Sequence, residues 1–593
     1  MFWYLLFNKK KELFGAPLPG EATRIVDLKV AIKETRSTQL RDIDAADLTV
    51  WRCKEPLLST QPEEVLQRRL SEIDFHNREQ VIKLASGARV ASLELGKDEV
   101  LLVEVPIAEY ADKRQDQLTP LRTFSKDIPD YLTNNPSTPP SSAGEIDNFR
   151  KSQAQPTSMI FCGRPYSAFL EIPPTLLCPQ FSQFVIDLDS CTPSTRDIRL
   201  FHELCQEMSD IFVDTVERNA RFLDIMCRYG FSDLQRKMIG DYTTGGVLDV
   251  YNDKVHRRAT YCILEVKNEI GQLVAEPMTR AEFHWLEAIR LCTDKDNKVF
   301  SRTNFPGVLL LHHGESCCST CLFIYAVFST GPYISVALAV YAGAPNVQIM
   351  NPVVPLHFHP SDTKAQATGE RFICALRRLL SDLKDYYLTD AFFESSSVQA
   401  EFPFYTTYTD GSASHQFVYE EQIDQKRVFH AHLRDNPEDK IIVKFTRHYG
   451  EDAHRAAYAR KFAPKLRAVE RFADGWVMVV MDDVSHQYCR INGRKLEKDV
   501  SKAVQNALAL LHADGYVHGD VQETNIMVKR DGVDSEDLDS ILLVDFDWAG
   551  KKNTVRYPSD IKLDHPELPR PWGVERGGLI SSVHDDQMLG YLS

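Results

Sequence analysis

Two short segments near the C-terminus set polar side chains into otherwise apolar sequence, and they constrain the chain more than any other feature. The first reads YVHGDVQETNIMV over Tyr516–Val528, and the second reads ILLVDFDWAG over Ile541–Gly550. In the first, an HGD triplet ends at Asp520, and Asn525 follows five positions later. In the second, Asp545 follows an apolar run typical of a strand. Two such segments in this order are too specific to be attributed to chance.

The two segments resemble the catalytic loop and the metal loop of protein-kinase-like phosphotransferases. The resemblance implies that Asp520 accepts the proton of an attacking hydroxyl, while Asn525 and Asp545 carry Mg²⁺ ions that bridge the phosphates of ATP. Lys444, in the apolar stretch IIVKF, is the lysine that would pair with the α- and β-phosphates. We therefore expect a two-lobed protein-kinase-like domain over residues 396–593, with ATP and Mg²⁺ as cofactors.

Several departures from the protein-kinase pattern leave the phosphoacceptor open. Gly519 stands where protein kinases carry arginine, and the HGD form is shared with small-molecule kinases of the aminoglycoside phosphotransferase type. No GxGxxG loop precedes Lys444, and Glu451 or Asp452 is the nearest acid that could pair with this lysine. The acceptor is therefore either a protein substrate or a small-molecule hydroxyl.

A second cluster of polar residues lies mid-chain, in GGVLDV and ILEVKNE. Asp249 and Glu265 belong to neighbouring apolar runs, which a β-hairpin would place side by side. Glu265 and Lys267 are two residues apart, so they point to the same face of a strand. Two carboxylates and an ammonium on one face are costly unless a divalent ion lies between them. We therefore expect Asp249 and Glu265 to bind Mg²⁺, and Lys267 to position or deprotonate an attacking water.

The spacing D-x(15)-E-x-K resembles the PD-(D/E)XK restriction-endonuclease-like superfamily. The resemblance implies an α/β core over residues 157–395 that hydrolyses DNA with Mg²⁺. This superfamily often adds an acid from a preceding helix, and Glu217 is the candidate metal ligand here. The following helix, Thr279–Leu291, lacks the glutamine that many relatives carry. A chance ExK in a buried strand is the alternative interpretation.

The first hundred residues contain the segments DLKVAIKE, IDAADLTVWR and DEVLLVEVP in that order. These resemble the ubiquitin-like header domain of Crinkler effectors. The resemblance implies a protein of fungal or oomycete type that is secreted without an obvious signal and acts in a host or competitor cell, including its nucleus. The C-terminal segments also resemble fungal kinase-like domains fused behind a nuclease-like unit in Crinkler-type proteins. A generic ubiquitin-like interaction module is the alternative for the head.

Composition excludes other classes of protein. The 593 residues include 69 Lys and Arg against 84 Asp and Glu, a balance that excludes a histone-like coat for nucleic acid. The 13 cysteines have no framework spacing and indicate reduced thiols. The uncharged stretch 316–361 is broken by Gly331-Pro332 into strand-length halves, which favours a buried hairpin over a membrane segment.

The expected organisation is a multidomain α+β chain. A ubiquitin-like head over residues 1–110 is followed by a flexible linker over 111–156, which contains the Pro- and Ser-rich run NNPSTPPSSAG. The restriction-endonuclease-like core and the kinase-like domain complete the chain. The enzymatic interpretation has a rival: a non-catalytic, nucleotide-gated binding scaffold, in which a pseudokinase is fused to an inactive nuclease fold.

Overall fold

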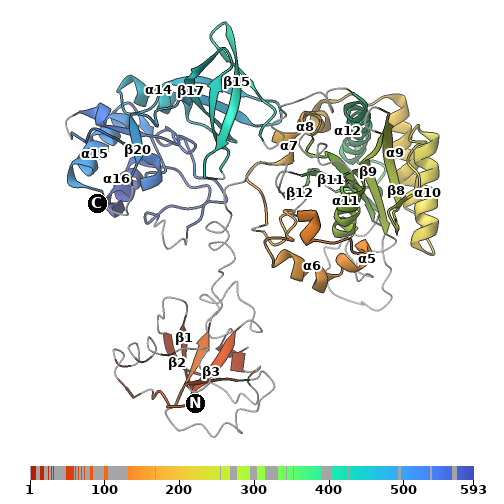
Figure 1. Cartoon of the computed structure of the whole chain (residues 1–593), viewed down its shortest axis with the longest axis horizontal. Coiled ribbons are helices and arrows are strands. Elements are labelled where there is room, and N and C mark those ends of the chain that lie inside the picture. The colour runs from red at the N-terminus through yellow and green to blue at the C-terminus, as the bar shows by residue number, and fades with distance from the viewer. Residues whose placement is uncertain are drawn as a thin grey trace. The chain divides into compact units, whose positions relative to one another are not determined.

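The chain forms two compact units in the computed structural model, residues 1–119 and 120–593 (Figure 1). In the second unit the described residues are 131–592, apart from 167, 254–255, 268–276, 294–302, 314–331, 342–343, 351–352, 390–401, 425, 492–495, 535–536 and 564–569. In the first unit they are mainly 2–7, 14–18, 48–58, 80–84 and 99–104, with single residues between.

The first unit contains a mixed five-stranded sheet in the order β2-β1-β5-β3-β4. Its strands are β1 (Phe2–Phe7), β2 (Phe14–Leu18), β3 (Thr49–Cys53), β4 (Val81–Lys83) and β5 (Val100–Glu104). β1 pairs with β5 in parallel and with β2 in antiparallel orientation. Ile25, Leu28 and Ile32 are helical and fully buried. The head is therefore a small α+β unit.

The predicted linker is folded from residue 131 onward, so the prediction of a flexible segment is wrong there. The helices α5 (Pro140–Ala143) and α6 (Ile146–Gln153) lie in it, and Pro140 opens α5, where its fixed φ suits a helix start. Arg290 donates to the backbone carbonyls of Leu132 and Asn135 at 2.8 and 2.6 Å. These tertiary contacts override the proline- and serine-rich composition. Residues 111–130 of the predicted linker lie outside the described residues.

The middle part, residues 131–389, has a six-stranded sheet ordered β12-β11-β10-β9-β8, with β13 paired to β11. The strands are β8 (Gly246–Asn252), β9 (Arg257–Lys267), β10 (Gly307–His313), β11 (Tyr333–Tyr341), β12 (Pro345–Ile349) and β13 (Val354–Pro355). β9 and β10 are parallel, and the other pairs are antiparallel. Every residue of β11 is buried, as in a strand covered on both faces. This strand was predicted as half of a hairpin, whose other half lies outside the described residues.

Helices pack on this sheet and give the α/β architecture that the sequence predicts. They are α7 (Pro174–Leu177), α8 (Pro179–Ser190), α9 (Thr195–Met208), α10 (Thr215–Arg228), α11 (Pro277–Thr293) and α12 (Thr363–Leu388). α11 packs against β9 and β10, and α12 packs against β8 and β9 (Figure 1). Among the described helices, none combines the length and the apolar character needed to cross a bilayer.

The C-terminal part, residues 402–592, has a sheet lobe and a mainly helical lobe. The sheet lobe is antiparallel, in the order β14-β15-β16-β17-β19-β18. Its elements are β14 (Thr407–Asp410), β15 (Ala413–Gln422), β16 (Val428–Leu433), β17 (Asn436–Thr446), α14 (Glu451–Ala459), β18 (Leu466–Arg471) and β19 (Val477–Asp482). The other lobe contains β20 (Tyr488–Arg490), α15 (Lys498–Ala513), β21 (Tyr516–Val517), β22 (Ile526–Lys529), β23 (Ile541–Leu543), β24 (Gly550–Lys551) and α16 (Ser582–Leu592). The apolar stretch around Lys444 lies in β17.

One hydrophobic core extends from the middle part into the sheet lobe of the C-terminal part. Trp476 is 5% exposed, and its Nε1–H donates to Thr175 Oγ1 at 3.2 Å. Asp474 accepts from Ser182 Oγ at 2.8 Å and from the Trp476 backbone N–H at 3.1 Å. The Arg447 guanidinium lies over the Trp476 ring, 3.7 Å from its centroid. The sheet lobe therefore buries its apolar surface partly against the middle part of the chain.

We expect Trp476→Ala to lower the free energy of unfolding of the full chain by about 3–5 kcal/mol, the usual cost of truncating a buried aromatic side chain. Denaturant unfolding followed by circular dichroism measures this change. Trp572→Ala is the matched control, because the Trp572 side chain is 93% exposed. Equal losses in the two variants would contradict the shared core.

Candidate functional site

Asp520 follows β21 in a loop that ends with a short 3-10 turn, Glu523–Asn525, and it is 9% exposed. The Asn525 amide donates to the backbone carbonyl of Asp520 at 2.9 Å and to its Oδ2 at 3.0 Å. These two bonds close the loop on itself. The structure therefore brings together the first two residues that the sequence singles out.

The other carboxylate oxygen of Asp520 accepts two further hydrogen bonds. One comes from Gln522 Nε2 and the other from Arg570 Nη1, which lies 2.7 Å away. The Arg570 side chain is 8% exposed, and its guanidinium lies 4.8 Å from the centroid of the Trp548 ring. A charge-assisted bond of this kind holds the carboxylate in one orientation. Sequence reasoning missed Arg570, because no motif connects it with a residue fifty positions earlier.

Lys444 on β17 is buried, and its Nζ lies 2.6 Å from Asp545 Oδ1 and 2.7 Å from Asp547 Oδ1. Burial alone lowers the pKa of Lys444, but the two carboxylates outweigh burial and raise the pKa above its usual range. Burial likewise opposes ionisation of Asp545, yet the lysine outweighs it and lowers the pKa of Asp545. For Asp547, burial and repulsion from Asp545 raise the pKa.

The acid that pairs with Lys444 does not come from α14, so the prediction of Glu451 or Asp452 as its partner is wrong. Glu451 accepts from Arg455 at 3.0 Å, and Asp452 is exposed. Sequence reasoning missed Asp547. Its signal was the second aspartate of DFDW, at the end of an apolar strand.

Asn525 and Asp545 lie at neighbouring ends of the paired strands β22 and β23, where the Val544 N–H donates to the Asn525 carbonyl at 3.0 Å. Asp545 has a φ of 68°, a left-handed conformation that is uncommon for a non-glycine residue and that occurs at functional sites. Amide and carboxylate oxygens are the ligands that Mg²⁺ prefers. Asn525 and Asp545 therefore fit a magnesium ion in the chemistry of their side chains.

Asp585 on α16 anchors the loop that carries Asp520, and sequence reasoning missed it. Its carboxylate is fully buried and accepts the backbone N–H groups of His518 and Gly519 at 2.8 and 2.7 Å. His512 Nε2 lies 2.9 Å from the same carboxylate. The signal was the acidic pair in HDDQML, within the last apolar stretch of the chain.

Gly519 has a backbone reason to be glycine. Its φ of 81° is left-handed, and a Cβ built on it would lie 2.9 Å from Ile580 Cδ1 and 3.2 Å from the Trp548 carbonyl oxygen. The loop geometry therefore accounts for the HGD form without reference to the kind of acceptor.

In the middle part, the register of the predicted hairpin separates the two carboxylates. Asp249 lies across from Thr260, whereas Glu265 is five residues further along β9, beyond Leu264, which pairs with Gly246. Five strand residues span about 16 Å. The prediction that the hairpin brings Asp249 beside Glu265 is therefore wrong, because the turn between β8 and β9 is too short for that register.

Asp249 and Glu217 have other partners. Asp249 Oδ1 accepts from Arg258 Nη1 at 2.5 Å and from Lys237 Nζ at 3.1 Å. Glu217 is exposed in the first turn of α10, where its Oε2 accepts the Val213 N–H at 3.1 Å. The structure does not bring either acid to Glu265. Within the described ranges, no group of three His, Cys, Asp or Glu side chains is arranged to hold a metal ion.

Glu265 and Lys267 do lie on one strand, both buried, next to α11. Glu265 Oε2 is 3.5 Å from Arg280 Nε, and its Oε1 is 3.3 Å from His284 Nε2. Burial raises the pKa of Glu265 to about 7, although Arg280 and Lys267 oppose the shift. Burial and the same two cations lower the pKa of His284 to about 3. One carboxylate among basic side chains is thus unlike the predicted acidic metal site.

Comparisons with known proteins find no matching family and no matching curated protein. Among solved structures, vaccinia related kinase 3 is similar at 19% identity, over 32% of this chain and 66% of that chain, with a TM-score of 0.24. The Cydia pomonella granulovirus kinase PK-1 is similar at 16% identity, over 29% of this chain and 65% of that chain, with a TM-score of 0.23. The chain thus spans just under two thirds of each kinase. Both of these neighbours are protein kinases.

We expect Glu265→Gln to remove a pH-dependent loss of stability. Because the folded protein raises the pKa of Glu265 from 4.5 to about 7, the wild type loses stability as pH rises from the lower value to the higher one, where the unfolded chain has released a proton that the folded chain still holds. The unfolding free energy of wild type relative to Glu265→Gln should fall by about 2.5 kcal/mol from pH 5 to pH 8. Denaturant titrations at both pH values measure it. Glu217→Gln, a change at an exposed glutamate, is the matched control. A pH profile that Glu265→Gln leaves unchanged would refute the assignment.

Proposed function

We propose that the C-terminal part binds ATP with Mg²⁺ and transfers the γ-phosphoryl group to a hydroxyl acceptor. The observation that carries this proposal is the meeting of three separated segments in one site. Lys444 forms an ion pair with Asp545. The backbone N–H of Val544, next to Asp545, donates to the Asn525 carbonyl, and the Asn525 amide donates to the Asp520 carboxylate. These residues, in these types, are what phosphoryl transfer from a nucleotide needs, because the reaction depends on positioning and charge stabilisation.

In the proposed mechanism Lys444 binds the α- and β-phosphates of ATP. Asn525 and Asp545 would hold Mg²⁺, which would supply positive charge to neutralise the phosphates. Asp520 orients the acceptor hydroxyl and takes its proton as the new P–O bond forms and the bond to ADP breaks. Asn525 keeps the Asp520 carboxylate oriented through its bond to Oδ2.

The acceptor in this proposal is a protein or a small molecule with a free hydroxyl. The glycine of the HGD triplet does not favour the second choice, because the backbone of the loop requires it. Label from γ-phosphate-labelled ATP separates the two classes, since it remains either on protein or in a low-molecular-weight product.

A second candidate function, a nucleotide-binding scaffold without turnover, is favoured by the contact of Arg570 with Asp520. Both groups are largely buried, and the 2.7 Å bond uses the oxygen that an acceptor hydroxyl could approach. A protein in this state binds ATP with Mg²⁺ and does not transfer phosphate. Measuring nucleotide binding and phosphate transfer on the same sample distinguishes the two functions.

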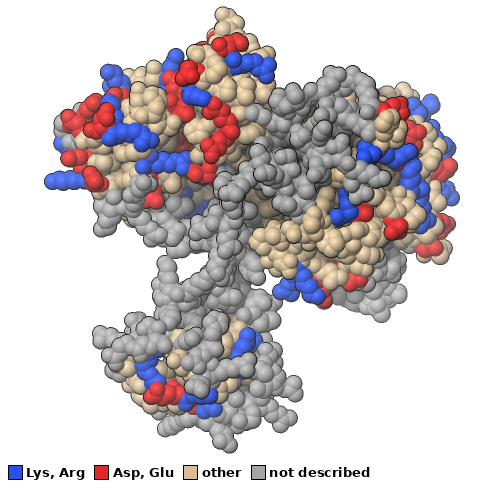
Figure 2. All heavy atoms as spheres, viewed as in Figure 1, with Lys and Arg blue, Asp and Glu red and all other residues tan. Residues whose placement is uncertain are grey.

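We also propose that the chain is a Crinkler-type effector that is secreted and acts in a host or competitor cell, including its nucleus. The support is the order of three head segments in the sequence, together with the mixed five-stranded sheet of an α+β head. For the middle part we propose a nuclease-like α/β fold that docks DNA or protein without cleaving it. Its support is the ExK strand, β9, together with the register that places Asp249 opposite Thr260 and away from Glu265. On the face drawn in Figure 2, acidic and basic side chains are interspersed, so docking of DNA would depend on a local patch.

We expect Asp520→Asn to lower kcat for phosphoryl transfer by about 10²- to 10⁴-fold, the usual contribution of a positioned base. Asp545→Ala should abolish transfer, because Mg²⁺ loses a ligand. Transfer of labelled γ-phosphate to protein or small-molecule acceptors, at several Mg²⁺ concentrations, measures both effects. Asp531→Asn is the matched control, since Asp531 is an exposed aspartate of the same lobe.

Contrary outcomes separate the proposals. Nucleotide binding without transfer in the wild type would favour the scaffold, and full activity in Asp545→Ala would refute the phosphotransferase site. Plasmid cleavage that depends on Mg²⁺ and on Lys267 would overturn the non-catalytic assignment of the middle part.

A further inference from the structure

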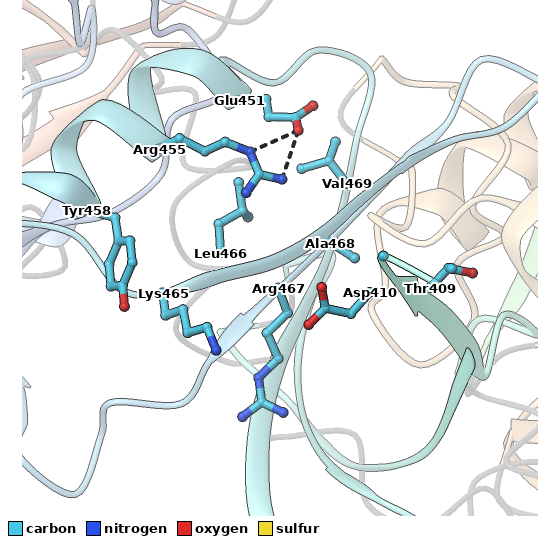
Figure 3. Close-up of a pocket in the computed structure, with 11 residues that line it drawn as sticks. Thr409, Asp410, Glu451, Arg455, Tyr458, Lys465, Leu466, Arg467, Ala468 and Val469 are labelled. Carbon is cyan, nitrogen blue, oxygen red and sulfur yellow. Dashed lines mark hydrogen bonds and ion pairs between the residues drawn. The ribbon is translucent and has the colours of Figure 1, made fainter. Parts of the chain in front are cut away.

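Helix α14 follows the lysine strand β17 directly but does not turn an acid toward Lys444. Glu451, in its first turn, lines a cavity of about 490 Å³ together with residues of β14 and β18. Figure 3 shows Glu451 bonded to Arg455 at this cavity, whose lining does not include Lys444. The buried residues of α14 are Ala453, His454 and Ala457. The helix therefore presents alanines and a histidine to the protein interior, and its acids face outward.

The start of α14 is also held against the loop after Asp545. The Gly450 N–H donates to the Phe546 carbonyl at 2.9 Å, and a Cβ at Gly450 would collide with the Ala549 carbonyl oxygen. The His454 ring stacks on Phe546, with centroids 4.5 Å apart. This close packing fixes the helix to the loop, so a movement of the helix could not bring an acid to the lysine without breaking these contacts.

Asp547 makes the contacts that the helix does not. Its Oδ1 lies 2.7 Å from Lys444 Nζ, and its Oδ2 accepts from Thr446 Oγ1 at 2.9 Å. Its carbonyl oxygen lies 2.6 Å from His448 Nδ1. Lys444 and Thr446 are alternate residues of β17 and so point to the same face of the strand. One carboxylate oxygen of Asp547 thus forms an ion pair with Lys444, and the other accepts a hydrogen bond from Thr446 on the same strand.

We propose that Asp547 is the positioning residue of Lys444, in place of an acid on α14, so that the nucleotide site is assembled without a movement of that helix. The inference rests on the proposed phosphotransferase function. Lys444 has two carboxylate partners, and Asp547 keeps it oriented when Asp545 serves Mg²⁺. In protein kinases the pairing of the lysine with a helix glutamate is a point of control. This chain lacks that control point, because the partner comes from the metal loop itself.

The first test compares Asp547→Asn with Glu451→Gln and Asp452→Asn in the full chain. Binding of a fluorescent ATP analogue with Mg²⁺ is measured at equilibrium, and KM and kcat are measured by phosphate transfer. We expect Asp547→Asn to raise the Kd and the KM for nucleotide about tenfold to hundredfold, because losing a hydrogen bond between charged groups usually weakens binding by that factor. Asp547→Glu should recover part of the loss. The two helix variants should stay within about twofold of wild type, as expected of exposed or surface-paired acids.

A second measurement tests the pairing without nucleotide. Acetylation of Lys444 by an N-hydroxysuccinimide ester, followed by mass spectrometry, should be faster in Asp547→Asn than in wild type and unchanged in Glu451→Gln. Thermal unfolding confirms that each variant is folded.

Two results would overturn the inference: loss of binding in Glu451→Gln as large as in Asp547→Asn, or equal acetylation of Lys444 in Asp547→Asn and wild type. Failure of the proposed function has a different signature, in which wild type transfers no phosphate while the acetylation difference persists.

Discussion

The C-terminal part depends on one buried ammonium group between two carboxylates. An unpaired lysine charge in the interior is costly, and Asp545 and Asp547 make the burial of Lys444 tolerable. The pairing also connects the sheet lobe to the loop after β23, since Lys444 and its two partners come from segments a hundred residues apart. The contacts that neutralise the buried Lys444 charge therefore also join the two lobes.

The middle part shows what a buried charge does when its partners differ. Lys267, Arg280 and His284 lie around Glu265, and burial raises the pKa of Glu265 to about 7 although the lysine and the arginine oppose the shift. A sequence spacing that fits a metal site is therefore insufficient, because the strand register decides which side chains meet. Here the register places Asp249 opposite Thr260, and its carboxylate forms ion pairs with Lys237 and Arg258.

The contact between the middle and C-terminal parts is mainly apolar and contains a few buried hydrogen bonds. Asp474 and Trp476 satisfy their buried polar atoms with Ser182 and Thr175, which makes the contact specific as well as apolar. The sheet lobe that carries Lys444 therefore owes part of its burial to a segment almost three hundred residues earlier. The strand that carries Lys444 therefore packs in the same hydrophobic core as the middle part.

The sequence by itself determined the local elements and the identity of the polar residues. An apolar run predicted β11, and the HGD and DFD segments predicted a loop and a strand that belong to one site. Only the tertiary structure decided that residues 131–156 fold, that Asp249 and Glu265 are apart, and that Asp547, Asp585 and Arg570 complete the site. The physical reason is that periodicity reports which face of an element is buried, whereas register and the choice of long-range partners depend on how separate segments pack.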